Sequence, residues 1–428
     1  MPDPTQQLPP LSLSDLAGLG RIAFFDSRNW VSVINADGTN IVELNQPTGI
    51  NTSSEHQSCQ LSWSPTGKRI VFSEWLIYIL PSNGGEVFQL AEDSMNCVDW
   101  SADGEFIAFP GTGERMEGGQ AFYTEVFTIR PSGADKTRLT FNNQSVIHLD
   151  FSPKTSTLVF DGDRKDIYTL EYGSGILLNK LQLPSHAEDN FMNPVWSPDG
   201  NMLAFEGYRQ YVTSPDLYIS NADGSQKRQL TSNSSSFAPA WSPDGNMLAY
   251  KFQFGQANEF NLMILDIRSG EQKTLSTLDT YDKFSRPTWS PDGKYIAYES
   301  AGNIQIVEVA TGREALLTQG TAPVWSPTTQ TLKKHEDCTS GWSRLQVWQQ
   351  GRVMGGPSDS PNRIRSNPGK STEQIGQLYP GATFEVLEGP VCADGLVFWL
   401  VENDQIPGGS GWTAEGDGNE YWLEPYQP

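Results

Sequence analysis

NPVWSPDGNMLAFEG, residues 193–207, contains the stretch that decides the fold: WSPDG at 196–200, which returns unaltered at 241–245 and 289–293. Variants of it (WSPTG, WSADG, FSPKT and WSPTT) begin at Trp63, Trp100, Phe151 and Trp325. Pro198 presets φ for a turn, Asp199 can hydrogen-bond the local backbone, and Gly200 can adopt a conformation closed to residues with a Cβ. Each copy is therefore predicted to be the turn between two strands.

The spacing of the copies predicts the architecture. Successive aromatic residues are 37, 51, 45, 45, 48 and 36 positions apart. A mean of about 44 residues is the length of a four-stranded propeller blade. Residues 202–207, which follow the turn, alternate in the period of two expected of a half-buried strand. The sequence therefore predicts an all-β propeller, with the repeated aromatics as core between blades.

The two ends of the repeat region fix the number of blades. GRIAFFDS (20–27), WVSVINADG (30–38) and NIVELN (40–45) are three strands with no preceding WSP, whereas APVWSP (322–327) is a first strand with none following. Together they make one blade, which with six complete copies predicts seven blades; six or eight are the alternatives. We expect residues near Trp325 to pair with residues near Ile22, which removes exposed sheet edges.

The repeat resembles that of the TolB-like propeller family, in which WSPDG is followed by an IAF or LAY strand, an IYV-type strand and a DG turn. The resemblance covers residues 20–327. The family's namesake has six blades after an α/β domain. Because the sequence shows neither feature, the resemblance implies the fold and not the namesake's role.

The regions outside the propeller lack the blade repeat. Residues 1–19 are predicted to be a flexible lead-in, and residues 328–342 a polar linker. Residues 343–428 resemble a bacterial SH3-like domain, a small barrel, through NRIRSNPG (362–369), IGQL (375–378), PGATFEVLEGP (380–390), GWTAEG (411–416) and YWLEP (421–425). The resemblance implies binding of cell-wall peptides or other proteins.

Charge and hydropathy exclude some partners. The net charge is −22 and the pI is near 4.5, so phosphate backbones and anionic lipid surfaces are repelled. We therefore expect neither a nucleic-acid partner nor insertion into a membrane. The first residues show no signal peptide. We expect an extracytoplasmic protein whose signal or anchor segment is missing from this sequence, because both resembled families occur mostly outside the cytoplasm; a cytoplasmic protein is the alternative.

The four cysteines bear on the compartment, since disulfides need an oxidising one. We predict a disulfide bond between Cys338 and Cys392, which would link the segment just before the SH3-like domain to the middle of that domain. Cys59 and Cys97 precede the aromatics of consecutive blades, where a bond and two free buried thiols are equally expected.

No motif for catalysis was found. The sequence lacks the serine-hydrolase elbow GxSxG, the metal-ligand spacings CxxC and HxxxH, and the phosphate-binding GxxxxGK[ST]. These absences predict a protein that is not an enzyme and has no metal or cofactor. The sequence does not exclude a structural ion in the propeller channel.

The candidate binding residues follow from the order of the strands. Tight SPDG and NADG turns lie on one face of the ring, and the longer loops, at 110–124, 183–192, 206–216, 251–260 and 276–285, lie on the other. Function is most often carried by such loops. Their aromatic and basic residues are interface-forming types; the predicted set is Arg115, Tyr123, His186, Tyr208, Arg209, Tyr211, Phe254, Tyr281 and Arg286.

In the SH3-like domain the candidate binding residues are Tyr379, Trp399 and Tyr421. The leading hypothesis is a non-enzymatic binding or scaffold protein. Its long-loop face engages a protein or peptide, and its small domain tethers it to a cell-wall peptide or glycan or to a protein. The alternatives are a propeller hydrolase or lyase acting on polysaccharide or peptide at the channel mouth, and a structural component of a surface assembly.

Overall fold

The computed structural model describes residues 9–44, 61–73, 76–84, 87–92, 97–115, 122–141, 145–163, 165–172, 177–181, 183, 189–209, 212, 214–254, 259–279, 285–327, 345, 350–354, 361–394, 396–416 and 422–426. The chain forms two compact units, residues 1–332 and 333–428. The division between them falls inside the predicted linker.

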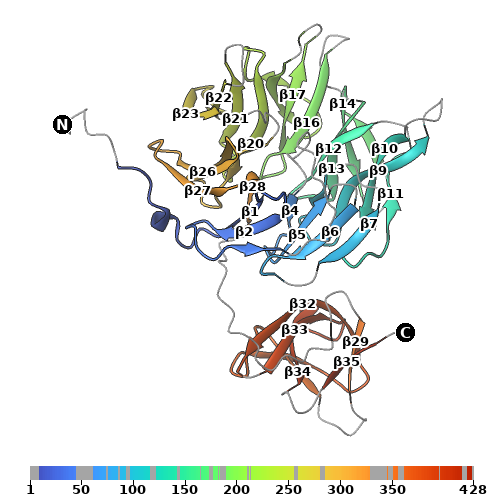
Figure 1. Cartoon of the computed structure of the whole chain (residues 1–428). Helices are drawn as coiled ribbons and strands as arrows, with labels where there is room; N and C mark the ends of the chain where they lie inside the picture. Colours follow the sequence, from blue (N-terminus) through green and yellow to red (C-terminus); the bar gives the residue numbers. More distant parts are fainter. Residues whose placement is uncertain are drawn as a thin grey trace. The chain divides into compact units, whose positions relative to one another are not determined.

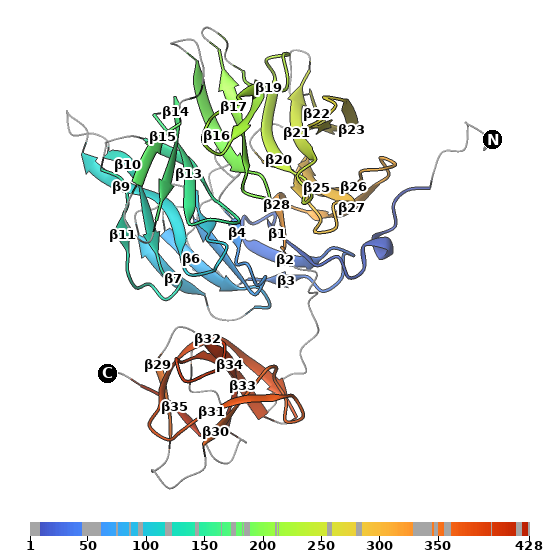
Figure 2. The ribbon, with the colours of Figure 1, turned by 180° about the vertical axis from the view of Figure 1, so that it is seen from behind.

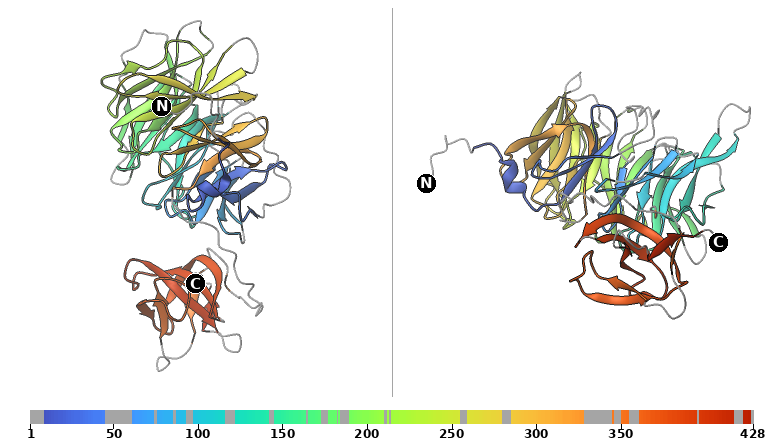
Figure 3. Two further views of the ribbon diagram at one scale, coloured as in Figure 1. Left: turned by 90° about the vertical axis from the view of Figure 1, so that its left-hand side faces the viewer. Right: turned by 60° about the horizontal axis from the view of Figure 1, so that its bottom comes forward.

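The first unit is a seven-bladed β-propeller. Its described residues form seven four-stranded antiparallel sheets, which follow one another around a ring in chain order, from blue to orange (Figures 1 and 2). The innermost strands contact one another in a closed cycle, from β4 (Leu61–Trp63) round to β28 (Thr321–Trp325) and back to β4. Figure 3 shows the same succession from two further directions.

The blades are named by their order in the chain. Blade 1 contains β28 with β1 (Arg21–Phe25), β2 (Val31–Asn35) and β3 (Val42–Glu43). Blade 2 contains β4, β5 (Arg69–Ser73), β6 (Leu76–Pro81) and β7 (Phe88–Glu92). Blade 3 contains β8 (Asp99–Trp100), β9 (Ile107–Arg115), β10 (Phe122–Ile129) and β11 (Thr137–Arg138). Blade 4 contains β12 (Val146–Phe151), β13 (Thr157–Gly162), β14 (Asp166–Glu171) and β15 (Leu177–Lys180).

The last three blades carry the unaltered motif. Blade 5 contains β16 (Asn190–Trp196), β17 (Met202–Tyr208), β18 (Asp216–Asn221) and β19 (Arg228–Gln229). Blade 6 contains β20 (Ser236–Trp241), β21 (Met247–Gln253), β22 (Glu259–Asp266) and β23 (Gln272–Asp279). Blade 7 contains β24 (Thr288–Trp289), β25 (Tyr295–Ser300), β26 (Asn303–Glu308) and β27 (Glu314–Gln319).

The ring closes as the sequence predicts. β28 pairs with β1, and Trp325 lies opposite Ile22. The closing blade is therefore built from one late strand and three early ones, which confirms the count of seven.

The WSPDG turns share one hydrogen-bond pattern. In blade 5, Ser197 Oγ donates to Asp199 Oδ1 over 2.6 Å, and the same oxygen accepts from Asn201 N at 3.0 Å. Met202 N donates to Ser197 Oγ at 2.9 Å, and Gly200 has a φ of 70°. Ser242–Asp244 and Ser290–Asp292 repeat the contacts. The motif's Ser and Asp are thus occupied in shaping the turn, and its Trp side chains are buried.

Some segments predicted to be irregular are ordered strand. β9 and β10 extend to Arg115 and from Phe122, and β23 continues to Asp279, because long hairpins add backbone hydrogen bonds beyond the blade body. Within the predicted flexible segment 1–19, a 3₁₀ helix spans Leu13–Leu16. Leu11 and Leu16 are buried there beside Leu317, so apolar packing holds residues 11–16 in place.

The described residues of the second unit form a seven-stranded sheet in the order β31-β30-β34-β33-β32-β29-β35. Its strands are β29 (Gln350–Val353), β30 (Asn362–Arg365), β31 (Gln374–Leu378), β32 (Thr383–Ala393), β33 (Leu396–Glu402), β34 (Ser410–Gly416) and β35 (Leu423–Pro425). Ile364, Phe384, Trp399 and Val401 belong to its core. The assignment to the bacterial SH3-like family stays a prediction.

Candidate functional site: the propeller channel

A cavity of about 380 Å³ lies at the centre of the propeller, between the innermost strands. Its walls are mostly proline, valine and tryptophan, and two of the prolines, Pro198 and Pro243, belong to tight SPDG turns. The cavity therefore reaches toward the tight-turn side of the ring. The polar residues among its described lining, apart from tryptophan, are Ser62, Asp99, Asp150, Arg286 and Thr288.

Four of these five residues occupy the same place in the repeat, directly before the aromatic. Side chains alternate along a strand, so these residues lie on the opposite face of the strand from the aromatics. The cavity lining includes all seven residues at this position. Around the ring this position is occupied by Ser62, Asp99, Asp150, Val195, Ala240, Thr288 and Val324. One repeat position thus supplies four of the five polar residues named above.

The same position joins neighbouring blades, in one of two ways. Where it is polar, its side chain accepts a hydrogen bond from the backbone N–H of the next blade's aromatic. In these four bonds the backbone N of Trp100 donates to Ser62 at 3.3 Å, that of Phe151 to Asp99 at 2.9 Å, that of Trp196 to Asp150 at 2.7 Å and that of Trp325 to Thr288 at 3.1 Å. Where it is apolar, its carbonyl accepts from the next indole. In these three bonds the indole Nε1 of Trp241 donates to the Val195 carbonyl at 3.3 Å, that of Trp289 to the Ala240 carbonyl at 3.1 Å and that of Trp63 to the Val324 carbonyl at 2.9 Å.

The two aspartates favour different protonation states. Burial raises the pKa of Asp99 to about 6. Burial, together with the charge of Asp99, raises the pKa of Asp150 to about 8. Both pKa values lie above the ordinary value of aspartate, so the pair retains a proton at neutral pH.

Arg286 brings a positive charge to the cavity. Its Nη2 donates to Asn193 Oδ1 at 2.5 Å, whereas its Nε is enclosed and has no hydrogen-bond partner among the described residues. Burial lowers the pKa of Arg286, while the charges of Asp150, Glu206 and Asp99 oppose that shift. A guanidinium remains ionised even so.

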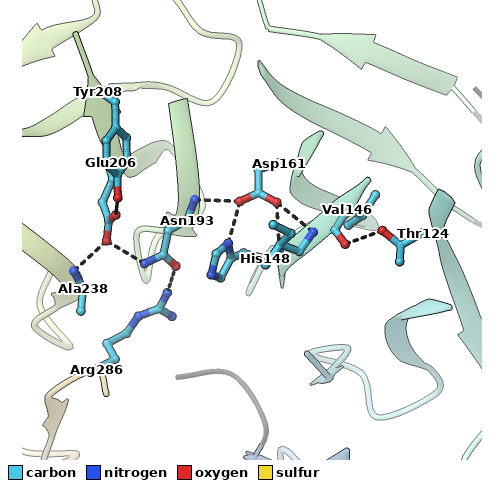
Figure 4. Close-up of polar contacts among 10 residues, drawn as sticks. Thr124, Val146, His148, Asp161, Asn193, Glu206, Tyr208, Ala238 and Arg286 are labelled. Atoms are coloured by element: carbon cyan, nitrogen blue, oxygen red, sulfur yellow. Dashed lines mark hydrogen bonds and ion pairs between the residues drawn. The ribbon is translucent and has the colours of Figure 1, made fainter. Parts of the chain in front are cut away.

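A polar network leads outward from Arg286 (Figure 4). Asn193 lies at a β-bulge with a φ of 54°, and its Nδ2 donates to Glu206 Oε1 at 2.9 Å. Glu206 also accepts from Tyr208 Oη at 3.0 Å and from Ala238 N at 2.9 Å. The contacts fix the amide orientation of Asn193, since arginine needs an acceptor and glutamate a donor.

The backbone of Asn193 continues the network to blade 4. Its N–H donates to Asp161 Oδ2 at 3.1 Å, and His148 Nδ1 lies 2.6 Å from the same oxygen. The charge of His148, with hydrogen bonds to the carboxylate, lowers the pKa of buried Asp161 although burial alone would raise it. The network thus connects Arg286 with Asp161 of blade 4 through the backbone of Asn193. Through the side chain of Asn193 and Glu206 it also reaches Tyr208, the last residue of β17 on the long-loop side.

The predicted long-loop residues lie in different surroundings. Arg286 lines the cavity and Tyr208 belongs to the network. Arg209 forms an ion pair with Asp216 at 2.8 Å, with 47% of its side chain exposed. Tyr123 and Phe254 are half-buried. His186, Tyr211, Tyr281 and the side chain of Arg115 lie outside the described residues.

The predictions for the second unit and the cysteines also have separate outcomes. Tyr379 is 59% exposed, whereas Trp399 is buried and donates its indole N–H to Glu415 at 2.8 Å, so Trp399 is not available to a ligand. Tyr421, Cys338 and the side chain of Cys392 lie outside the described residues. Cys97 is disulfide-bonded, which removes the free-thiol alternative for it; its partner is not among the described side chains.

The residues predicted from the sequence did not include Asp99, Asp150, Asn193 or Glu206. A signal was present, because an acidic residue stands before the aromatic in VDWS (98–101) and LDFS (149–152), where three other copies have valine or alanine. Among the described residues, no group of three or more His, Cys, Asp or Glu could hold a metal ion. The described part of the chain also contains no helix of the length and hydropathy needed to span a bilayer.

The fold and channel define the class, a seven-bladed β-propeller protein. Residues 178–335 match the family model described as PD40, TolB beta propeller domain. The Tol-Pal system protein TolB of Syntrophus aciditrophicus is 30% identical over 82 residues. That match spans 19% of this chain and 18% of the relative.

Solved structures of similar fold include enzymes. Oligogalacturonate lyase from Vibrio parahaemolyticus is 12% identical with a TM-score of 0.48, over 94% of this chain and 98% of that one. A putative 6-phosphogluconolactonase from Bacteroides uniformis is 13% identical with a TM-score of 0.48, over 71% and 98%. The prediction that the chain is not an enzyme is therefore corrected: proteins named as enzymes share the fold, so a missing linear motif does not exclude catalysis. At these identities the likeness shows the fold alone and assigns no reaction.

Proposed function

We propose that this protein is a binding protein whose propeller holds part of a protein or peptide partner at the central channel. The observation that carries the proposal is an open cavity of about 380 Å³ lined by Arg286, whose guanidinium has one described hydrogen-bond acceptor, Asn193 Oδ1. Pockets of about 300 to 1,000 Å³ with a few polar groups are typical of ligand sites. The match to TolB-type propeller repeats supports a protein partner and leaves its identity open.

The long-loop face is proposed to provide the outer part of the contact. Tyr208 and Arg209 stand side by side at the end of β17, and Arg209 is half exposed although paired with Asp216. Tyrosine and arginine are enriched among residues that carry binding energy. The bonds from Tyr208 through Glu206 and Asn193 to Arg286 would make binding at the rim sensitive to the channel.

The second unit is proposed to be an SH3-like tether for a cell-wall peptide or glycan or for a protein. Tyr379, exposed beside Pro380, is its best-placed described aromatic. We also propose an extracytoplasmic location. The bonded state of Cys97 supports it, since disulfides persist in oxidising compartments.

An affinity selection tests the binding proposal. The whole chain is incubated with a synthetic library of short peptides bearing free termini, and retained peptides are identified by mass spectrometry. We expect Arg286→Gln to lose the peptides that the unmodified chain retains. Arg28→Gln removes a charge from a surface arginine paired with Asp26 and should retain them. Retention of no peptides, or equal retention by Arg286→Gln, would contradict the proposal.

A second candidate function is acid–base catalysis in the same cavity. Two carboxylates with separated pKa values, about 6 for Asp99 and about 8 for Asp150, are the arrangement that supplies a base and an acid together. A hydrolase or lyase acting on polysaccharide or peptide would use them. Conversion of such a polymer by the unmodified chain, and its loss in Asp150→Asn with binding retained, would support this candidate over simple binding.

A further inference from the structure

The charge of the channel differs from that of the whole protein. The chain carries a net charge of −22, yet the one cation among the described residues lining the cavity is Arg286. No carboxylate of the described residues lies within ion-pair distance of its guanidinium nitrogens; its described partner is the amide oxygen of Asn193. The charges of Asp150, Glu206 and Asp99 act on this guanidinium without forming an ion pair with it, so its donors remain open to an anionic ligand.

The two aspartates of the cavity already accept hydrogen bonds from neighbouring blades. Asp99 accepts from Ser62 Oγ at 2.8 Å and from Phe151 N at 2.9 Å, one bond on each oxygen. Asp150 accepts from Trp196 N at 2.7 Å. Both aspartates therefore tie neighbouring blades together. Of the nitrogens of Arg286, Nη2 is the one that has a described partner, and Oδ1 of Asp150 has no described donor. Arg286 therefore has donor capacity left for a ligand acceptor.

The protonation state of Asp150 supports the same ligand chemistry. Burial, together with the charge of Asp99, raises the pKa of Asp150, so the pair of aspartates retains a proton at neutral pH, and a protonated Asp150 can donate a hydrogen bond. Arg286 and Asp150 would then offer two donors to one ligand group. An ammonium ligand, by contrast, would face the charge of Arg286 and would have to displace the shared proton.

The remaining walls suit a short apolar segment. Pro239 and Pro323 stand in the innermost strands β20 and β28, and Pro287 directly precedes β24. Proline has no N–H that could compete as a donor. Trp196, Trp241 and Trp289 supply further apolar surface. The volume of about 380 Å³ is enough for a carboxylate and the residue or two attached to it.

We propose that the channel of this propeller recognises a carboxylate, that of a peptide C-terminus, with Arg286 donating to the carboxylate oxygens. The inference rests on the proposed function, because it names the group of the peptide partner that enters the cavity. It assigns Arg286 to ligand recognition. Asp99 is assigned mainly to the joint between blades.

Calorimetric titration of the whole chain at pH 7 tests this with four probes. They are acetyl-trialanine with a free carboxylate, its C-terminal amide, trialanine amide with a free ammonium group, and glucuronate. We expect the acid to bind at least about tenfold more tightly than either amide, because a charge-assisted pair to Arg286 is lost in both. Arg286→Gln should abolish that preference, and Arg28→Gln should keep it.

Each outcome decides between the claims. Equal binding of acetyl-trialanine and its amide would overturn the carboxylate assignment and leave the binding function standing. Preference for the ammonium probe would do the same and would move recognition to the aspartates. Tighter binding of glucuronate than of the peptide acid would overturn the peptide source. Absence of binding by all four probes would overturn the inference, whereas the library selection decides the function separately. The comparison of acid with amide uses the unmodified chain, so it does not depend on whether Arg286→Gln folds.

Discussion

A single side chain in each repeat, the one before the aromatic, decides how a blade is joined to the next. Asp150 presents a carboxyl oxygen that accepts from the backbone of Trp196, and the indole Nε1 of Trp196 is buried without a described partner. Ala240 has no such acceptor, and the indole of Trp289 instead donates to its carbonyl. The same repeated residue, tryptophan, therefore carries a different energetic weight in different blades.

Replacement of these tryptophans by phenylalanine measures that difference. Trp289→Phe loses the bond to Ala240, whereas Trp196→Phe removes a donor that is already unsatisfied, and both side chains are 7% exposed. We expect Trp289→Phe to lower the free energy of unfolding by about 1 kcal/mol more than Trp196→Phe. Urea unfolding of both variants provides the comparison. Equal losses would mean that the indole bond contributes nothing.

The aspartate pair makes stability depend on pH. Both folded pKa values, about 6 for Asp99 and about 8 for Asp150, lie above the usual value for aspartate of about 4. The folded chain therefore holds protons that the unfolded chain has lost. The stability that these groups contribute is full below about pH 4 and is lost as the pH rises through 6 and then 8.

Asp150→Asn tests this dependence, since asparagine can still accept from Trp196 but does not titrate. We expect its free energy of unfolding to change less between pH 6 and 8 than that of the unmodified chain, by up to about 1.4 kcal/mol per pH unit. Asp223→Asn is the control: hydrogen bonds from Ser225 lower the pKa of Asp223, so that side chain stays ionised throughout this range. A slope in Asp150→Asn identical to that of the unmodified chain would show that Asp150 does not hold the proton.

At the scale of the element, β-bulges in the innermost strands create the polar network. Asn193, Ala238 and Ala322 precede a proline and have φ values of 54°, 54° and 49°. The N–H groups of Asn193 and Ala238 point at carboxylates of the preceding blade, Asp161 and Glu206. Strand alternation predicted these strands from the sequence. It could not predict the bulges, because they depend on buried acceptors supplied by a different blade.

Glycine substitution measures the strain at one bulge. A residue with a Cβ pays about 1 to 2 kcal/mol at positive φ, which offsets the entropic cost of glycine in a strand. We therefore expect Ala238→Gly to be neutral or stabilising. Ala240→Gly, in the same strand but outside the positive-φ positions, should cost about 1 kcal/mol. Equal destabilisation in chemical unfolding would contradict a strained bulge.

At the scale of the whole molecule, the ring depends on strands far apart in the sequence. The pairing of Trp325 with Ile22 followed from counting strands at both ends, so seven blades could be predicted. The site could be predicted only in part. Arg286 was picked out as a loop residue, but it stands two residues before β24 and lines the channel. The acidic partners were missed because an aspartate before a repeated aromatic also fits an ordinary strand.

Truncation tests the closure. A chain ending at Gly320 lacks β28, which leaves β1 with an open edge and blade 1 with the strands β1, β2 and β3. A chain ending at Pro327 keeps β28 and is the matched control. We expect the chain ending at Pro327 to keep a cooperative thermal unfolding transition and the chain ending at Gly320 to lose it or to associate in gel filtration. Indistinguishable melting of the two chains would contradict closure by β28.

The most direct test of the central claim, that the propeller binds its partner at the channel, is the nuclear magnetic resonance of the Arg286 side chain. The Nε–H signal is assigned by its absence from Arg286→Gln and followed while a peptide retained in the library selection is added. The account predicts a saturable shift of this enclosed N–H at the same peptide concentrations as binding. Binding that leaves the Arg286 signal in place would contradict it and would place the partner elsewhere on the protein.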